Sequence, residues 1–222
     1  MTGQLAFDLP ALVALKRSDF FVSPVNALAL AALDGWRDWP QGKMVLVGPA
    51  GAGKTHLAHI WAGETGAALL PATAVAGADL PAFGARGALV VEDADRLAGR
   101  AAEEALFHLH NLLAAGGGAL LLTATTPPRD WGLGLPDLAS RMQATSVARL
   151  DGPDDALLSA VLIKLFADRQ ITVPPSLISY LVQRMDRSFA AARALVAGLD
   201  AHALAKGRPV TRQLAAELLD GL

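Results

Sequence analysis

The amino-acid sequence predicts an α/β protein with a parallel sheet, followed by a small all-helical part. The first observation is that the apolar runs at 44–47, 88–91 and 119–123 are continuous rather than alternating, as in strands that are buried on both faces. The second is that helical patterns separate these runs. The third is that no strand-like run follows residue 150.

Within the α/β part the sequence predicts alternating helices and strands. Glycine and proline residues mark the ends of several helices, as Gly35 and the Gly116–Gly118 run do, because they interrupt helical geometry. In chain order we expect a helix over 26–36, a strand over 44–47, a helix over 55–65, a strand over 88–91, a helix over 101–115 and a strand over 119–123.

The pattern changes near Asp151. A capped helix follows this residue, a second helix opens at the Pro174–Pro175 pair and extends to about 185, a third covers 188–204, and Thr211 caps a fourth. The expected division is a tail over 1–12, an α/β nucleotide-binding core over 13–150 and a helical lid over 151–222.

Composition narrows the class of protein. Hydrophobic residues make up 53% of the 222 residues, which argues against a disordered chain. The absence of cysteine excludes disulfides and thiolate metal sites. A formal net charge of −2, with Lys and Arg scattered, gives no basic face for DNA phosphates. No apolar run approaches the roughly 18 residues of a membrane helix, and no secretion signal is evident, so we expect a cytoplasmic protein.

The segment after the first strand has the composition of a phosphate-binding loop. Residues 48–55 match the pattern G-x-x-x-x-G-K-T and stand between a predicted strand and a predicted helix. Backbone N–H groups and the helix amino terminus would surround phosphate oxygens. Lys54 would neutralise the β- and γ-phosphates and Thr55 would hold Mg²⁺. The sequence therefore predicts ATP or ADP with Mg²⁺, bound by Pro49, Ala50, Gly51, Ala52, Gly53, Lys54, Thr55 and His56.

A pair of acids ends the strand over 88–91. One carboxylate at this position can hold Mg²⁺ and the next can orient the attacking water. By order, Glu92 takes the metal-side position and Asp93 the water-orienting one. Since Glu and Asp differ in reach, we expect slow intrinsic ATP hydrolysis at most.

Several segments, in order, carry a family resemblance. They are FFVSPVNALALAAL, GAGKTHLAHI, LVVEDADRLAG, LLLTATTPP, LPDLASRM and MDRSFAAARALVAGLD, and they span about residues 18–220. As a set they resemble the DnaA branch of the AAA+ ATPases, and within it the short DnaA-homologous regulators. The Glu92–Asp93 order departs from the family's usual leading Asp, and Thr125 stands where Asp is frequent.

The resemblance implies roles for residues outside the phosphate loop. It places Phe21, Val22 and Asn26 beside the adenine and Thr125 near the γ-phosphate. It makes Arg141 an arginine finger that acts on a neighbouring subunit. It gives Arg187 the nucleotide-facing position of the lid, with Arg193 as the second choice.

The resemblance also implies a function. Such regulators stimulate hydrolysis of ATP held by the DnaA initiator, give inactive ADP-DnaA and so restrain replication initiation. The sequence ends after the lid, before any DNA-reading helix-turn-helix domain, which favours the regulator over DnaA itself. The alternative is a DnaA-like helicase loader or single-stranded DNA-binding module. A homodimer is a further possibility, and an autonomous motor ATPase is disfavoured by the Glu92–Asp93 order.

The amino-terminal segment contains Gln4, Leu5, Phe7 and Leu9. Its Gln-Leu start resembles the peptide with which these regulators dock on the bacterial sliding clamp, the β subunit of DNA polymerase III. The glutamine amide and the apolar side chains suit an extended peptide that binds a partner. We therefore expect a clamp-binding tail that brings the protein to the replisome on the nucleoid, and DNA contact only through the clamp. The other reading is an edge strand on the protein's own core.

Overall fold

The computed structural model describes residue 17 and residues 20–219. The predicted clamp-binding residues Gln4, Leu5, Phe7 and Leu9 lie outside the described residues, so their role stays a prediction. The short helical turns cover Trp36–Asp38, Pro40–Gly42, Ala72–Gly77, Ala94–Arg96 and Pro128–Asp130.

A five-stranded parallel sheet forms the centre of the α/β part, in the order β2-β3-β4-β1-β5. In the middle of β1, Val45 pairs with Leu122 on one side and with Val147 on the other. The predicted α/β class is confirmed. The strands are β1 (Lys43–Val47), β2 (Ala68–Pro71), β3 (Ala88–Glu92), β4 (Ala119–Ala124) and β5 (Ser146–Arg149).

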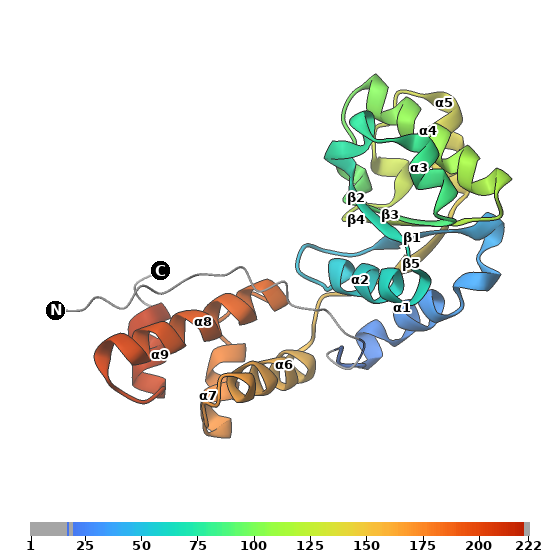
Figure 1. Cartoon of the computed structure of the whole chain (residues 1–222). Helices are drawn as coiled ribbons and strands as arrows, with labels where there is room; N and C mark the ends of the chain where they lie inside the picture. Colours follow the sequence, from blue (N-terminus) through green and yellow to red (C-terminus); the bar gives the residue numbers. More distant parts are fainter. Residues whose placement is uncertain (1–16, 18–19, 220–222) are drawn as a thin grey trace.

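Helices cover both faces of this sheet (Figure 1). Along β1, Met44 and Leu46 join the hydrophobic cluster under α1 and α2, whereas Val45 and Val47 join the cluster under α4 and α5. Burial on both faces explains why the central strands read as unbroken apolar runs. The helices are α1 (Pro24–Asp34), α2 (Lys54–Thr65), α3 (Leu80–Ala85), α4 (Arg100–Ala115) and α5 (Pro136–Ala144).

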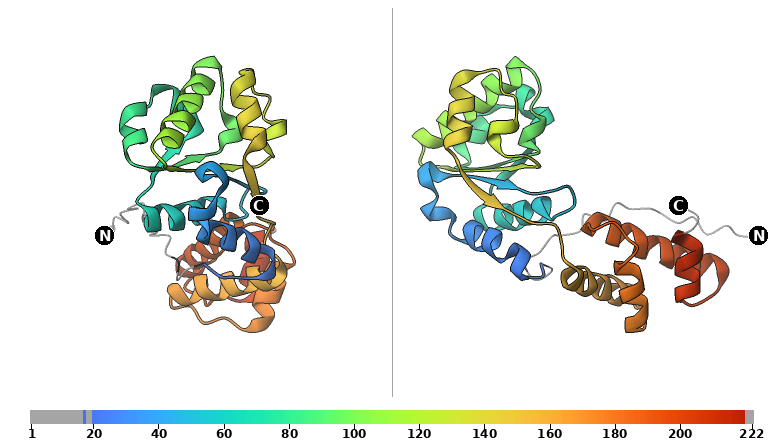
Figure 2. Two further views of the ribbon diagram at one scale, coloured as in Figure 1. Left: turned by 90° about the vertical axis from the view of Figure 1, so that its right-hand side faces the viewer. Right: turned by 180° about the vertical axis from the view of Figure 1, so that it is seen from behind.

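Four further helices follow β5 and lie to one side of the sheet (Figure 2). They are α6 (Asp155–Asp168), α7 (Pro175–Val182), α8 (Phe189–Lys206) and α9 (Arg212–Leu219). Leu162, Phe166 and Leu199 belong to a hydrophobic cluster built from these helices and the turns between them. Asp154 caps α6 by accepting the Leu157 N–H at 2.8 Å, and Ser188 caps α8. Among the described residues, no helix combines the length and apolarity needed to cross a membrane.

Candidate nucleotide-binding site

The loop between β1 and α2 has the backbone of an anion cradle. Gly51 and Gly53 have φ angles of +76° and +101°, a conformation that glycine adopts without a Cβ penalty. The helix α2 begins directly after them at Lys54. Its amino-terminal N–H groups and its positive dipole end therefore point into the loop.

Lys54 is held inside this loop. Its side chain is buried, and Nζ donates to the carbonyl oxygens of Gly48 at 2.7 Å and Pro49 at 3.0 Å. Burial lowers the pKa of Lys54, while the nearby carboxylates of Asp93 and Asp95 act in the opposite direction. A bound phosphate would give the buried Lys54 ammonium group a negatively charged partner and so favour its charged form.

A cavity of about 280 Å³ opens over the loop. It brings together a large part of the predicted site, whereas Pro49 and Ala52 do not line it. Arg96 and Phe189, which the sequence analysis did not assign to the site, and Arg193, its second choice for the lid arginine, complete the wall. The predicted residues that line it are Ala50, Gly51, Gly53, Lys54, Thr55, His56, Asp93 and Thr125.

The acids after β3 are arranged differently from their order in the sequence. Asp93 lines the cavity, with a φ of +53° and its Oδ2 3.6 Å from Nη1 of Arg96. Glu92 is half-buried at the end of β3 and does not line the cavity. Thr55 and Asp93 both line this cavity, and their hydroxyl and carboxylate oxygens are hard donors of the kind that Mg²⁺ takes. The geometry thus favours Asp93 over Glu92 as the metal-side acid.

Asp95 fixes Thr125, the residue predicted to lie near the γ-phosphate. Its Oδ2 accepts the Thr125 backbone N–H at 2.7 Å and also the Thr125 hydroxyl. These bonds join the turn after β3 to the end of β4. The sequence motif contained Asp95, but nothing in its spacing indicated this role.

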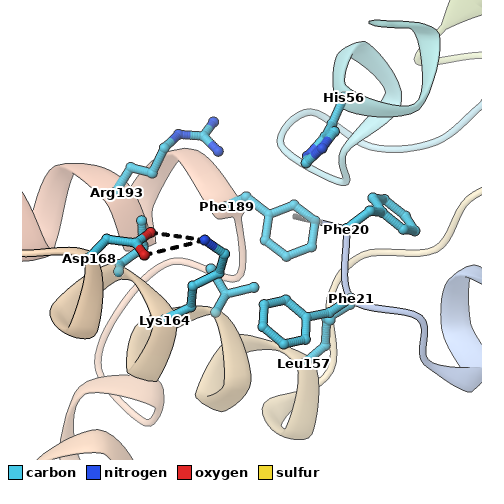
Figure 3. Close-up of a pocket in the computed structure, with 10 residues that line it drawn as sticks. Phe20, Phe21, His56, Leu157, Lys164, Asp168, Phe189 and Arg193 are labelled. Atoms are coloured by element: carbon cyan, nitrogen blue, oxygen red, sulfur yellow. Dashed lines mark hydrogen bonds and ion pairs between the residues drawn. The ribbon is translucent and has the colours of Figure 1, made fainter. Parts of the chain in front are cut away.

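A second cavity, of about 160 Å³ and drawn in Figure 3, shares His56, Phe189 and Arg193 with the first. Its apolar walls come from the segment before α1 and from the lid helices, and at one side Lys164 Nζ pairs with Asp168 Oδ2 at 3.0 Å. Phe20 also packs edge-on against His56, with ring centroids 5.4 Å apart. Flat aromatic walls with few polar groups suit a purine base. The apolar lining residues are Phe20, Phe21, Leu157, Val161, Leu165 and Phe189.

Two residues predicted to lie beside the adenine do not line this cavity. Val22 is exposed. Asn26 is buried and donates through Nδ2 to the Phe21 carbonyl at 2.8 Å, while its Oδ1 accepts the Ser23 N–H at 2.9 Å. Asn26 therefore shapes the segment that carries Phe21, and Phe21 faces the cavity.

Phe189, at the start of α8, forms a wall that the two cavities share (Figure 3). Its N–H donates to the Gly51 carbonyl at 3.2 Å. A Cβ at Gly51 would lie 2.3 Å from the Ser188 Cβ, and one at Gly53 would lie 3.1 Å from the Phe189 ring. The lid thus contacts the phosphate loop directly, and the loop needs glycine at both positions.

The three candidate arginines lie in different places. Arg193 lines both cavities. Arg187 lines neither and pairs with Asp155 at 2.6 Å, so the geometry favours the second choice for the lid arginine. Arg141, on α5, lines neither cavity, and its guanidinium carbon lies 5.1 Å from the Phe107 ring centroid.

Solved structures identify the fold, although no protein-family model matches the chain. Domain III of the replication initiation protein DnaA from Thermotoga maritima superposes with a TM-score of 0.77 at 20% identity, over 96% of this chain and 98% of that one. AMPPCP-bound DnaA from Aquifex aeolicus gives 0.70 at 16% identity, over 82% and 64%. The RuvB branch migration motor from Thermotoga maritima gives 0.65 at 20% identity, over 88% and 66%.

These likenesses show the fold: a parallel sheet followed by a group of helices, as in AAA+ P-loop NTPase domains. Within that class the chain has a DnaA-like arrangement, which extends over nearly the whole of the Thermotoga domain. The chain spans less than two thirds of the length of the Aquifex DnaA structure.

Proposed function

We propose that the protein binds ATP or ADP with Mg²⁺ across the two cavities. The base enters the aromatic cavity beside Phe21, and the phosphates lie on the loop against Lys54. Arg193 faces both, while Thr55 and Asp93 hold the metal. Thr55 and Asp93 would thereby supply positive charge against the phosphates through the metal they hold. Asp95 accepts the Thr125 N–H and so holds Thr125 at the cavity wall, from which Thr125 would contact the terminal phosphate. The Aquifex DnaA structure is described as AMPPCP-bound, which supports this nucleotide class.

We further propose that the protein is an Hda-type regulator that stimulates ATP hydrolysis by DnaA. The observation that carries this proposal is the separation of Arg141 from its own phosphate loop. Arg141 precedes β5, whose Ser146 pairs with Met44 near the amino end of β1. The phosphate loop follows the carboxyl end of β1. Five strand residues span about 15 Å, so Arg141 is poorly placed to serve its own nucleotide.

An exposed arginine at this end of the sheet suits a nucleotide held by a neighbouring AAA+ subunit. A guanidinium that reaches a transferring γ-phosphoryl group accelerates hydrolysis by roughly 10³- to 10⁵-fold. DnaA is the proposed neighbour because the fold of this chain is DnaA-like. The proposed product is ADP-DnaA, which is inactive for initiation. We also propose that the amino-terminal residues Gln4, Leu5, Phe7 and Leu9 dock on the sliding clamp, as the resemblance implies.

The experiment measures hydrolysis of DnaA-bound ATP in single turnover, with this protein, sliding clamp and DNA added in turn. We expect acceleration only with all components, and loss of the acceleration in Arg141→Ala. The Gln4→Ala/Leu5→Ala double variant should lose clamp binding but keep nucleotide affinity. An unchanged DnaA rate would overturn the proposal and direct attention to single-stranded DNA or helicase binding; one similar structure is DnaA bound to AMPPCP and single-stranded DNA.

A further inference from the structure

A buried carboxylate accepts hydrogen bonds from the residues just before α5, the helix that carries Arg141. Glu103, on α4, is 8% exposed. Its two oxygens accept the N–H groups of Gly134 at 3.1 Å and Leu135 at 2.6 Å, immediately before α5. A charged acceptor here satisfies two backbone donors and complements the positive end of the helix dipole. Glu103 of α4 therefore anchors the start of α5.

The same face of α4 also carries Phe107, whose ring contacts the guanidinium group of Arg141. Phe107 follows Glu103 by four residues, so both side chains lie on one face of the helix. The Arg141 guanidinium carbon stands 5.1 Å from the Phe107 ring centroid, within the range of a cation–π contact. One rigid helix thus holds both the start of α5 and the guanidinium near its end.

Arg141 lies near two buried basic side chains. Lys43 from β1 and His110 from α4 are almost fully buried. Burial lowers the pKa of each, and the positive charge of Arg141 adds to this lowering. No ion pair of Arg141 with an acid is found among residue 17 and residues 20–219. The guanidinium is held against an aromatic face at the surface, and its donors stay available for an anion.

We propose that Phe107 and Glu103 are positioning residues that present Arg141 to a phosphate group held by another protein. This inference rests on the proposed function. Glu103 fixes the helix, and the Phe107 ring restricts the flexible arginine side chain, so that less rotamer freedom is lost when the guanidinium reaches the phosphate. Neither residue touches the nucleotide.

The test uses the DnaA single-turnover assay with variants of the full chain, titrated to saturation. We expect Phe107→Leu to lower the maximal stimulated rate by about 10- to 100-fold, because a small misplacement of a catalytic group is costly. The concentration for half-maximal effect should stay unchanged. Phe107→Tyr, which keeps the aromatic face, should retain the rate. Glu103→Gln should behave like Phe107→Leu.

Matched controls come from the same helix. Glu104 pairs with Arg100 at the surface, and His108 is exposed. Each is the sequence neighbour of a positioning residue and points to a different side of α4, because successive helical residues do not face the same way. Glu104→Gln and His108→Ala should therefore keep the full rate. The affinity of each variant for ADP at its own loop reports folding, and should match that of the unaltered protein.

The outcomes separate the two proposals. If the Arg141→Ala variant stimulates DnaA hydrolysis as strongly as the unaltered protein does, Arg141 is not the finger. The proposed function then fails, and the positioning role with it. If Arg141→Ala removes the stimulation while Phe107→Leu and Glu103→Gln keep it, only the positioning role is wrong. If Phe107→Leu loses ADP affinity, the Glu103→Gln and Glu104→Gln pair decides.

Discussion

At the scale of single residues, His110 makes stability depend on pH. It is 1% exposed, its Nδ1 has no hydrogen-bond partner among the described residues, and burial beside Lys43 lowers its pKa to about 4. As pH falls, the unfolded chain takes up this proton first, near pH 6.5. The stability linked to neutral His110 is fully present above pH 6.5 and is lost as pH falls toward 4.

The unaltered protein should lose about 2 to 3 kcal/mol of unfolding free energy between pH 7 and pH 4.5 through His110, and we expect His110→Leu to abolish this part of the loss. The measurement is the free energy of unfolding in urea at pH 7 and pH 4.5 for both proteins. The exposed neighbour serves as the control, and His108→Leu should follow the unaltered protein. An equal loss of unfolding free energy between the two pH values in all three proteins would contradict the role of His110.

Arg187 and Arg193 give a second residue-scale prediction. Arg193 lines both cavities, whereas Arg187 is engaged by Asp155. Arg193→Ala should weaken ATP binding by about tenfold, since a hydrogen bond to a charged group contributes about 1.5 to 3 kcal/mol. Arg187→Ala should change it little. Calorimetric titration with ATP distinguishes them, and the reverse ranking would restore Arg187 as the lid arginine.

At the scale of elements, the contact between α8 and the phosphate loop depends on Gly51. In Gly51→Ala the new methyl group meets Ser188, and the positive φ adds backbone strain. We expect ATP affinity to fall by more than tenfold. Gly66→Ala is the matched control, because Gly66 has a φ of +73° and open space around it. It should lower the melting temperature but leave ATP affinity intact, and equal affinities in the two variants would refute the contact's role.

The sequence predicted the strands that are buried on both faces and missed the two strands at the edges of the sheet, and it also missed the helices α3 and α5. The runs that became β1, β3 and β4 are central and apolar. The strands β2 and β5 have four residues each and lie at the two ends of the sheet. β5 alternates exposed residues with the buried Ala148, so its composition resembles that of a loop. Only pairing with β1 makes it a strand.

The candidate site divides in the same way. The phosphate loop was predictable because its backbone conformation requires a fixed pattern of glycines. Of the apolar walls of the second cavity only Phe21 was predicted, from the family resemblance. Leu157, Val161 and Phe189 were missed because they lie on helices whose apolar residues also suit a core. Whether Asp93 or Glu92 faces the cavity depends on the positive φ of Asp93 after β3. Spacing alone does not indicate that turn.

At the scale of the whole molecule, a nucleotide would join two separately packed parts. The lid helices have their own hydrophobic cluster, apart from the two clusters on the sheet. Saturating ATP, at about 100 times its dissociation constant, should add about 2.7 kcal/mol of stability. For a chain of this size that raises the melting temperature by about 5 to 10 °C. Scanning fluorimetry measures the shift, and Lys54→Ala should show none; a shift of equal size in that variant would argue for a different site.

The hydrogen bond between Phe189 and Gly51 also bears on timing. Because one aromatic ring lines both the base cavity and the phosphate cavity, a movement of α8 away from the loop would open both at once. Dissociation would then be a single lid-opening event rather than a stepwise release. Substitutions along α8 should alter residence time far more than association rate, which would make this helix the element that sets the pace of the nucleotide cycle.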